Sequence, residues 1–292
     1  MDPFKHSIDS QFQSHKGANL FNEEALGTLS FNEETLLSIR NIGLLEKEHE
    51  KLLVEYVCEK AIREFCIANQ YYNFTEDNRD KLKAIYSELI EQLRDGDTPL
   101  DDIAIQHYRK LSNWLKDANP FAEKIYASQD IAIPAVACSE YSPELQLKIL
   151  KIDPDTLKEP IIDIGCGEHG YLVSYLRTKG IRAFGIDRFA SNIPYLTKCD
   201  WFEYSFQKDE WGSIISNLGF TNHFRHHHFR KDGNFIAYAK KYMEIISSLK
   251  RGGSFYYAPD VPFIEGFLDK SLYRVETFTL ETDISSVKLT RI

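Results

Sequence analysis

The stretch that decides the fold spans residues 159–170 and reads Glu159-Pro160-Ile161-Ile162-Asp163-Ile164-Gly165-Cys166-Gly167-Glu168-His169-Gly170. Its isoleucines are β-branched and apolar, which is typical of a short strand buried inside a parallel sheet. The glycines that follow let the backbone turn sharply and approach a ligand closely. Residues 171–177 then read as a helix, which ends at Lys179-Gly180. The stretch therefore predicts a strand, a glycine turn and the start of a helix.

A second carboxylate follows at the end of the next predicted strand, residues 181–186. Asp187 lies about 20 residues beyond the glycines, where nucleotide-binding folds hold the two hydroxyls of a ribose. A helix cap is the alternative role for this residue. Gly165, Gly167 and Gly170 match the G-x-G-x-x-G fingerprint of dinucleotide binding, but this match alone is a weak signal.

Asp163 narrows the choice of ligand because it lies inside the strand, two positions before the first glycine. A buried carboxylate there would repel a pyrophosphate, whereas it suits a ligand with an ammonium group. The pattern Asp163-x-Gly165-x-Gly167 resembles motif I of the class I S-adenosylmethionine-dependent methyltransferases. The alternatives are an NAD-dependent oxidoreductase and a non-catalytic methyltransferase-like partner subunit.

The composition is ordinary for a soluble globular protein, with 43% hydrophobic and 27% charged residues in 292 positions. That length is enough for two domains. No apolar run approaches the ~20 residues that span a bilayer, and the first residues contain no apolar signal core. The five cysteines form no C-x-x-C pair, which fits a reducing compartment. We therefore expect a cytoplasmic protein that binds no membrane.

The formal charge of −9 argues against a general nucleic-acid binder. The acidic excess lies in the first half: residues 1–150 contain 16 Lys and Arg against 26 Asp and Glu, whereas residues 151–292 contain 19 against 18. A solvated helical surface would explain this excess. The alternative is an acidic wall that attracts a cationic substrate or partner.

Residues 1–150 carry helical signals and no strand signal, and we predict a helical cap or substrate-recognition region there. Residues 1–30 have little periodicity and are predicted as a partly ordered arm. The apolar side chains that would pin this arm to the body, or alternatively cover a ligand, are Phe4, Phe12, Leu20 and Phe21. His107 lies on an apolar helix face, and we interpret it as a satisfied core histidine rather than a ligand. The predicted helices begin near Asn32, Thr75, Thr98 and Ser142.

From Glu159 onward the pattern alternates strands and helices, which is typical of a parallel sheet covered by helices. We predict later strands over 211–218 and 254–258, a weak helix over 188–198, and helices over 235–249 and 262–271. Two strands, 273–280 and 286–292, form a terminal hairpin. The pattern therefore predicts the α/β fold class with an all-helical N-terminal region. The resemblance implies a Rossmann-like seven-stranded methyltransferase sheet over residues 151–292.

The resemblance implies S-adenosylmethionine as the cofactor and assigns roles to individual residues. It implies that Asp163 lies near the methionyl ammonium group, and that Gly165 and Gly167 let the backbone approach the methionyl part and the ribose. Asp187 would hold the ribose hydroxyls.

The adenine and the sulfonium would lie further along the sheet. The resemblance implies that Asp200 and Trp201 hold adenine, although a turn residue is the alternative reading of Asp200. Asn217, at the end of the fourth strand, would border the sulfonium.

Four histidines follow the fourth strand within residues 222–230, which read Asn222-His223-Phe224-Arg225-His226-His227-His228-Phe229-Arg230. They could supply a general base of near-neutral pKa or a substrate contact, and His223 is the candidate because it lies nearest the strand end. Structural or solvated roles are the alternative for these histidines. Histidines also bind metals. The run offers no carboxylate or cysteine at ligand spacing, so we assign no metal to it.

The sequence narrows the class of methyl acceptor only through a motif that it lacks. Nucleobase methyltransferases of this family carry D/N-P-P-Y/F after the fourth strand, whereas this chain has Asn217-Leu218-Gly219-Phe220. We therefore expect no nucleic-acid substrate. The resemblance implies methyl transfer to a nitrogen or oxygen atom of a small molecule, a natural-product intermediate or a peptide, and the acidic first half suits a cationic one.

Overall fold

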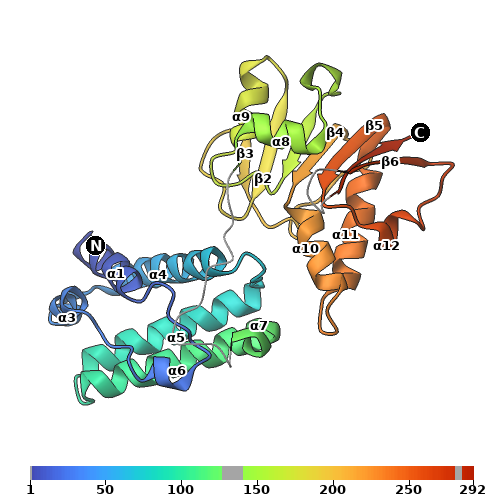
Figure 1. Ribbon diagram of the computed structural model, residues 1–292. Helices are drawn as coiled ribbons and strands as arrows, with labels where there is room; N and C mark the ends of the chain where they lie inside the picture. Colours follow the sequence, from blue (N-terminus) through green and yellow to red (C-terminus); the bar gives the residue numbers. More distant parts are fainter. Residues whose placement is uncertain (1, 127–140, 280–284) are drawn as a thin grey trace. The chain divides into compact units, whose positions relative to one another are not determined.

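The computed structural model describes residues 2–126, 141–279 and 285–292, which form two compact units, Met1–Cys138 and Ser139–Ile292. We predicted a boundary after residue 150. In the structure α8 (Pro143–Leu150) belongs to the second unit, because Leu147 and Leu150 pack into the core of that unit. Figure 1 shows the helices and strands of each unit. None of the helices in the described ranges is long and apolar enough to cross a bilayer.

The first unit is helical in all its described elements. They are α1 (Asp2–Ser14), α2 (Glu23–Leu26), α3 (Glu33–Ile39), η1 (Ile42–Leu44), α4 (Lys47–Ala68), α5 (Glu76–Asp95), α6 (Leu100–Ala118) and α7 (Pro120–Tyr126). Helix α5 packs against both α4 and α6, and α1 packs against α3 and α4.

Local capping fixes several helix ends where the sequence predicts them. The Asn32 side chain accepts a hydrogen bond from the Thr35 N–H at the start of α3. Thr75 and Asn78 form a capping box at the start of α5, and Gly96 ends that helix in the left-handed conformation.

The predicted arm over residues 1–30 is wrong for its first part, which forms α1. Tertiary contacts stabilise this helix, since a helix of this length is marginal alone. The Tyr56 hydroxyl donates to Asp9 at 2.9 Å, and Lys60 forms an ion pair with Asp9 at 3.2 Å. The predicted pinning holds further on, because Leu20 and Phe21 are buried.

The second unit is built on one seven-stranded sheet in the order β3-β2-β1-β4-β5-β7-β6. Strands β1 to β5 run parallel, and β7 runs antiparallel between β5 and β6. The strands are β1 (Ile161–Ile164), β2 (Ala183–Asp187), β3 (Leu196–Lys198), β4 (Trp211–Asn217), β5 (Leu249–Ala258), β6 (Tyr273–Thr279) and β7 (Ser285–Arg291). The predicted α/β fold class, with its seven-stranded sheet and helical N-terminal region, is confirmed.

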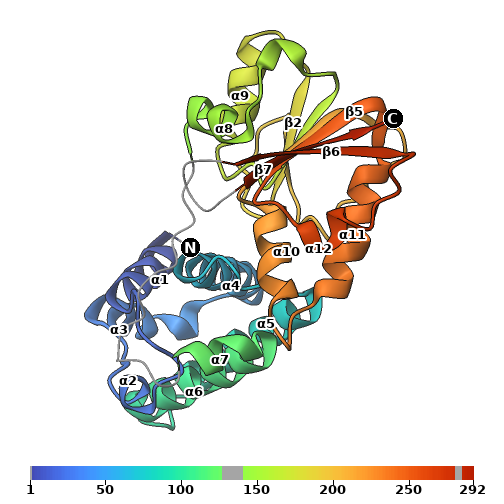
Figure 2. The ribbon, with the colours of Figure 1, turned by 45° about the vertical axis from the view of Figure 1, so that its right-hand side comes forward.

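Helices cover both faces of this sheet (Figure 2). On one face α8 and α9 (Tyr171–Thr178) bury Leu150, Leu172 and Leu176. On the other face α10 (Phe220–His228) and α11 (Phe235–Ser247) bury an aromatic cluster that includes Phe224 and Tyr242. The short elements η2 (Pro154–Thr156) and α12 (Pro262–Glu265) complete the unit.

The predicted helix over residues 188–198 is wrong. Residues 196–198 form β3, which pairs in parallel with β2, and the Gly185 N–H donates to the Tyr195 carbonyl at 3.0 Å. Pro194 lacks the N–H that a helix would need there, so the segment pairs with the sheet instead. Strand β5 begins at Leu249, five residues earlier than predicted, and α12 is shorter than predicted.

Candidate functional site

The candidate site lies where β1 and β4 end, at the carboxyl edge of the parallel strands. Open α/β sheets bind ligands at this edge, where the order of connections reverses on either side of the first strand. Strand β1 pairs with β2 on one side and β4 on the other, so Asp163, Asp187 and Asn217 come to the same edge. The structure brings together residues that lie up to 54 positions apart in the chain.

Asp163 is the most unusual residue of this edge. Its side chain is buried within β1, and its Oδ2 has no hydrogen-bond partner among the described residues. Burial, with the nearby Asp187 carboxylate, raises the pKa of Asp163 to about 7. A buried carboxyl group without a donor is costly, so this oxygen is poised to receive one.

The turn after β1 requires glycine. Gly165 and Gly167 have φ angles of 77° and 79°, in the left-handed region that favours glycine. A Cβ atom on Gly165 would lie 3.6 Å from the Gly219 Cα and 3.7 Å from the Trp201 ring. The turn therefore runs beside the end of β4 and the indole ring of Trp201.

Asp187 holds this turn in place. Its Oδ2 accepts a hydrogen bond from the Gly167 N–H at 3.2 Å, and its Oδ1 accepts one from the Phe189 N–H at 2.8 Å. Asp200 is partly engaged by its own turn, because its Oδ1 accepts from the Phe202 N–H at 2.8 Å. Asp200 thus makes the turn contact that was the alternative to adenine binding. Asp187 caps no helix, because β2 is followed by β3, and its carboxylate contacts the glycine turn instead.

Asn217 ends β4 with an amide that has no partner. Neither its oxygen nor its nitrogen makes a hydrogen bond within the described part of the chain, although both atoms are buried. Together with Asp163 Oδ2, this amide gives the ends of two adjacent strands unsatisfied polar atoms. Most buried polar groups in native proteins are paired, so two orphaned groups at one edge point to a bound polar ligand.

The sequence reasoning missed Ser216, which joins the two strands. Its hydroxyl donates to the Ile164 carbonyl at 2.8 Å and accepts from the Phe220 N–H at 3.0 Å. The residue therefore fixes the start of α10 against the end of β1. The available signal was a fully buried serine at the end of an apolar strand, where a parallel sheet otherwise favours apolar residues.

His223 lies in the first turns of α10 with its ring against Trp201. The ring centroids are 4.9 Å apart in an edge-to-face arrangement, and His223 is only 6% exposed. Burial, followed by the positive charge of Arg188, lowers the pKa of His223 well below its usual value. The imidazole is therefore neutral at pH 7.

The remaining histidines of the run make local contacts. The His227 ring accepts from the Asn234 N–H at 3.2 Å, and His228 stacks on Phe263 with ring centroids 3.6 Å apart. Burial and Arg230 lower the pKa of His226 and His227 to about 4. The predicted near-neutral pKa is therefore wrong for His223, His226 and His227. No group of three or more His, Cys, Asp or Glu in the described ranges is arranged as a metal site.

Comparisons with known proteins found similarity at the level of structure. No family model and no curated protein sequence matches the chain. A structure from Listeria monocytogenes, described as an S-adenosylmethionine-dependent methyltransferase, matches with a TM-score of 0.38 and 15% identity over 50% of this chain and 98% of its own. A protein from Streptococcus mutans, described as a methyltransferase and solved with SAH, matches with a TM-score of 0.36 and 12% identity over 53% of this chain and 100% of its own. The plantazolicin methyltransferase BpumL, also solved with SAH, matches with a TM-score of 0.33 and 12% identity over 45% of this chain and 75% of its own.

Proposed function

We propose that the second unit binds S-adenosylmethionine and transfers its methyl group to a nitrogen or oxygen atom of a small molecule or peptide. The observation that carries this proposal is the unpartnered Oδ2 of Asp163, buried beside the glycine turn. An amino-acid ammonium group offers this oxygen both a hydrogen-bond donor and a positive charge. Asp163 therefore suits the methionyl end of the cofactor.

The other residues of the edge fit the remaining parts of this cofactor. We assign the ribose hydroxyls to Asp187, whose carboxylate is already held against the glycine turn by the Gly167 N–H. Asp200 and Trp201 are assigned to adenine, with the indole as the apolar surface. The unpartnered amide of Asn217 is assigned to the methionyl part near the sulfonium.

The bound cofactor supplies an electrophilic methyl group on a sulfonium. The chain has to hold the acceptor atom in line with that group and to exclude competing water. This positioning requires no covalent intermediate with the protein.

His223 remains the candidate base, but its low pKa limits the kind of acceptor that it could deprotonate. A base whose pKa is far below neutral does not deprotonate an alkylammonium group efficiently, so the ring suits an acceptor that is already neutral. If His223 acts as base, His223→Ala lowers kcat and changes the pH profile of turnover. An unchanged kcat at every pH would remove the base role.

The alternative ligand, a nicotinamide dinucleotide, would bring a negative charge to the place where S-adenosylmethionine brings its ammonium group. A dinucleotide would bring its pyrophosphate to the glycine turn, close to Asp163 and Asp187, and repulsion between like charges would oppose this. A non-catalytic subunit would bind the cofactor without turnover, so product formation separates it from an enzyme.

Calorimetric titration of the full chain tests this proposal. We expect S-adenosylhomocysteine, the demethylated product, to bind one site per chain and NAD⁺ to give no heat. Asp163→Asn should weaken S-adenosylhomocysteine binding at least tenfold, since it removes the charge that faces the ammonium group. Asp155→Asn is the matched control, because Asp155 is an exposed aspartate of the same unit and lies outside the site. Binding of NAD⁺ but not of S-adenosylhomocysteine would overturn the proposal.

A further inference from the structure

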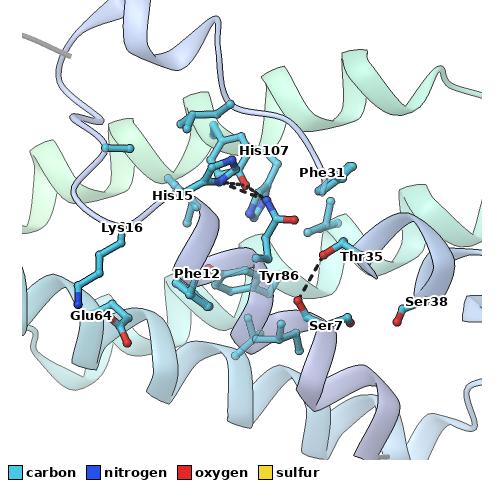
Figure 3. A pocket seen from close by; sticks show the side chains of 18 of the residues that line it. Ser7, Phe12, His15, Lys16, Phe31, Thr35, Ser38, Glu64, Tyr86 and His107 are labelled. Carbon is cyan, nitrogen blue, oxygen red and sulfur yellow. Dashed lines mark hydrogen bonds between the residues drawn. The ribbon is translucent and has the colours of Figure 1, made fainter. Parts of the chain in front are cut away.

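The first unit contains a cavity that the proposed methyl transfer does not use. Its volume is about 270 Å³, and side chains of α1, α3, α4, α5 and α6 line it (Figure 3). Native interiors contain few voids larger than a water molecule. A cavity of ~150 Å³ in another protein already holds benzene, so this one has room for a bicyclic molecule.

The wall of the cavity is mostly apolar. Phe12 and Ile8 from α1, Leu53 and Val57 from α4, and Leu111 from α6 contribute to it. Apolar walls exclude charged molecules, because an ion loses its hydration there without compensation.

Several polar side chains of the wall have hydrogen-bond partners within the first unit. The His15 ring contacts the Tyr108 hydroxyl at 2.9 Å, and the Gln11 amide donates to the same hydroxyl at 3.0 Å. The Thr35 hydroxyl donates to the Ser7 carbonyl at 3.3 Å (Figure 3). These groups have partners and do not call for a ligand.

Tyr86 and His107 differ from them. Each residue is 6% exposed and lines the cavity, and no hydrogen bond joins either side chain to another described residue. Their ring centroids lie 5.1 Å apart, so the two rings are neighbours in the wall of the cavity. We interpreted His107 from the sequence as a satisfied core histidine. The structure buries it as expected but gives it no hydrogen bond.

Both groups are uncharged at neutral pH. Burial lowers the pKa of His107 to about 3 and raises the pKa of Tyr86 well above its usual value. Tyr86 therefore offers an O–H donor, and His107 offers one N–H donor and one acceptor nitrogen. Two neutral groups of this kind match a hydroxyl or a carbonyl group.

We propose that this cavity binds an uncharged, largely apolar small molecule whose hydroxyl or carbonyl group bonds to Tyr86 and His107. The apolar body of the molecule fills the space between α1, α4 and α6. A ligand bonded to Tyr86 and His107 supplies the hydrogen-bond partners that the described residues do not. The site is independent of the cofactor site proposed for the second unit.

Three matched probes test this proposal in fluorescence titrations of the full chain. 2-Naphthol has the hydroxyl, naphthalene lacks it, and 2-naphthoate carries a charge. We expect 2-naphthol to bind at least fivefold more tightly than either of the other two. Tyr86→Phe keeps the ring and should reduce the affinity for 2-naphthol toward that for naphthalene, because only the contact with His107 remains.

A second pair of variants locates the site. Ser38 lines the cavity from α3, so Ser38→Trp should fill part of the space and abolish binding of 2-naphthol. Leu37→Trp on the same helix is the control, since Leu37 is 57% exposed and does not line the cavity. The proposal is overturned if 2-naphthol does not bind, if 2-naphthoate binds as tightly, or if Tyr86→Phe leaves the affinity unchanged. Circular dichroism of each variant verifies that it is folded.

Discussion

At the scale of single residues, the proposed cofactor site depends on Asp163. The sequence identifies it, because a carboxylate inside an isoleucine-rich strand is unusual. The protonation state of Asp163 could not be predicted from the sequence in the same way. The raised pKa depends on burial between β2 and β4 and on the approach of Asp187, which only the paired strands bring about.

His223 shows where residue-level prediction stops. Its position after the fourth strand follows from the sequence, and the structure puts it next to Trp201 as part of the same edge. The pKa prediction failed because sequence spacing does not reveal how deeply a helix buries one of its faces. His223 is turned into the unit, where desolvation favours the neutral ring.

The raised pKa of Asp163 predicts a pH dependence of stability. Between its ordinary pKa of 3.8 and about 7, the folded chain keeps a proton that the unfolded chain has lost, so this group makes the fold less stable as pH rises through that window. In the ligand-free protein, Asp163→Asn should therefore stabilise more at pH 8 than at pH 5, by about 2–3 kcal/mol. Urea unfolding at the two pH values measures the difference. Asp155→Asn should show no such change, and an equal effect of Asp163→Asn at both pH values would contradict the raised pKa.

At the scale of elements, the sequence predicts correctly those helix ends that depend only on side chains near in sequence. The capping of α3 by Asn32 and of α5 by Thr75 needs only neighbouring residues. Prediction failed for α1 and for residues 188–198, where partners distant in sequence decide. Asp9 of α1 meets Tyr56 and Lys60, and β3 exists because β2 lies beside it.

Strand β4 depends on a glycine for its close approach to the chain before β1. A Cβ atom on Gly212 would lie 2.5 Å from the Lys158 carbonyl oxygen and 2.6 Å from that of Glu159, both in the backbone. Gly212→Ala should therefore lower the free energy of unfolding by about 1–3 kcal/mol. Thermal unfolding monitored by circular dichroism measures the loss. Gly266→Ala is the control, because Gly266 has an ordinary helical φ of −64° and its nearest contact would be 3.4 Å. Equal melting temperatures for both variants would contradict this account.

At the scale of the whole molecule, the chain forms two compact units. The switch from helical to alternating patterns predicts the division, and the antiparallel final strand was expected from the terminal hairpin. The pattern could not assign α8, because its short amphipathic stretch reads the same in either unit. The structure assigns α8 to the second unit because Leu147 and Leu150 pack against the sheet.

Every residue assigned to the cofactor lies in the second unit, which has cores on both faces of its sheet. We expect residues 141–292 alone to fold and to bind S-adenosylhomocysteine with an affinity within threefold of that of the full chain. Calorimetry of the two proteins compares them, and circular dichroism verifies the fold of the shorter one. A folded shorter protein that does not bind would show that the site needs residues of the first half.

The position of a bound ligand relative to Asp163 tests the central claim most directly. The measurement is a crystal structure of the full chain with S-adenosylhomocysteine. We predict that Asp163 Oδ2 receives the ligand's ammonium group, directly or through one water molecule, with the ribose at Asp187. A complex in which the nucleotide is bound elsewhere, or in which the Asp163 carboxylate points away from it, would contradict the account.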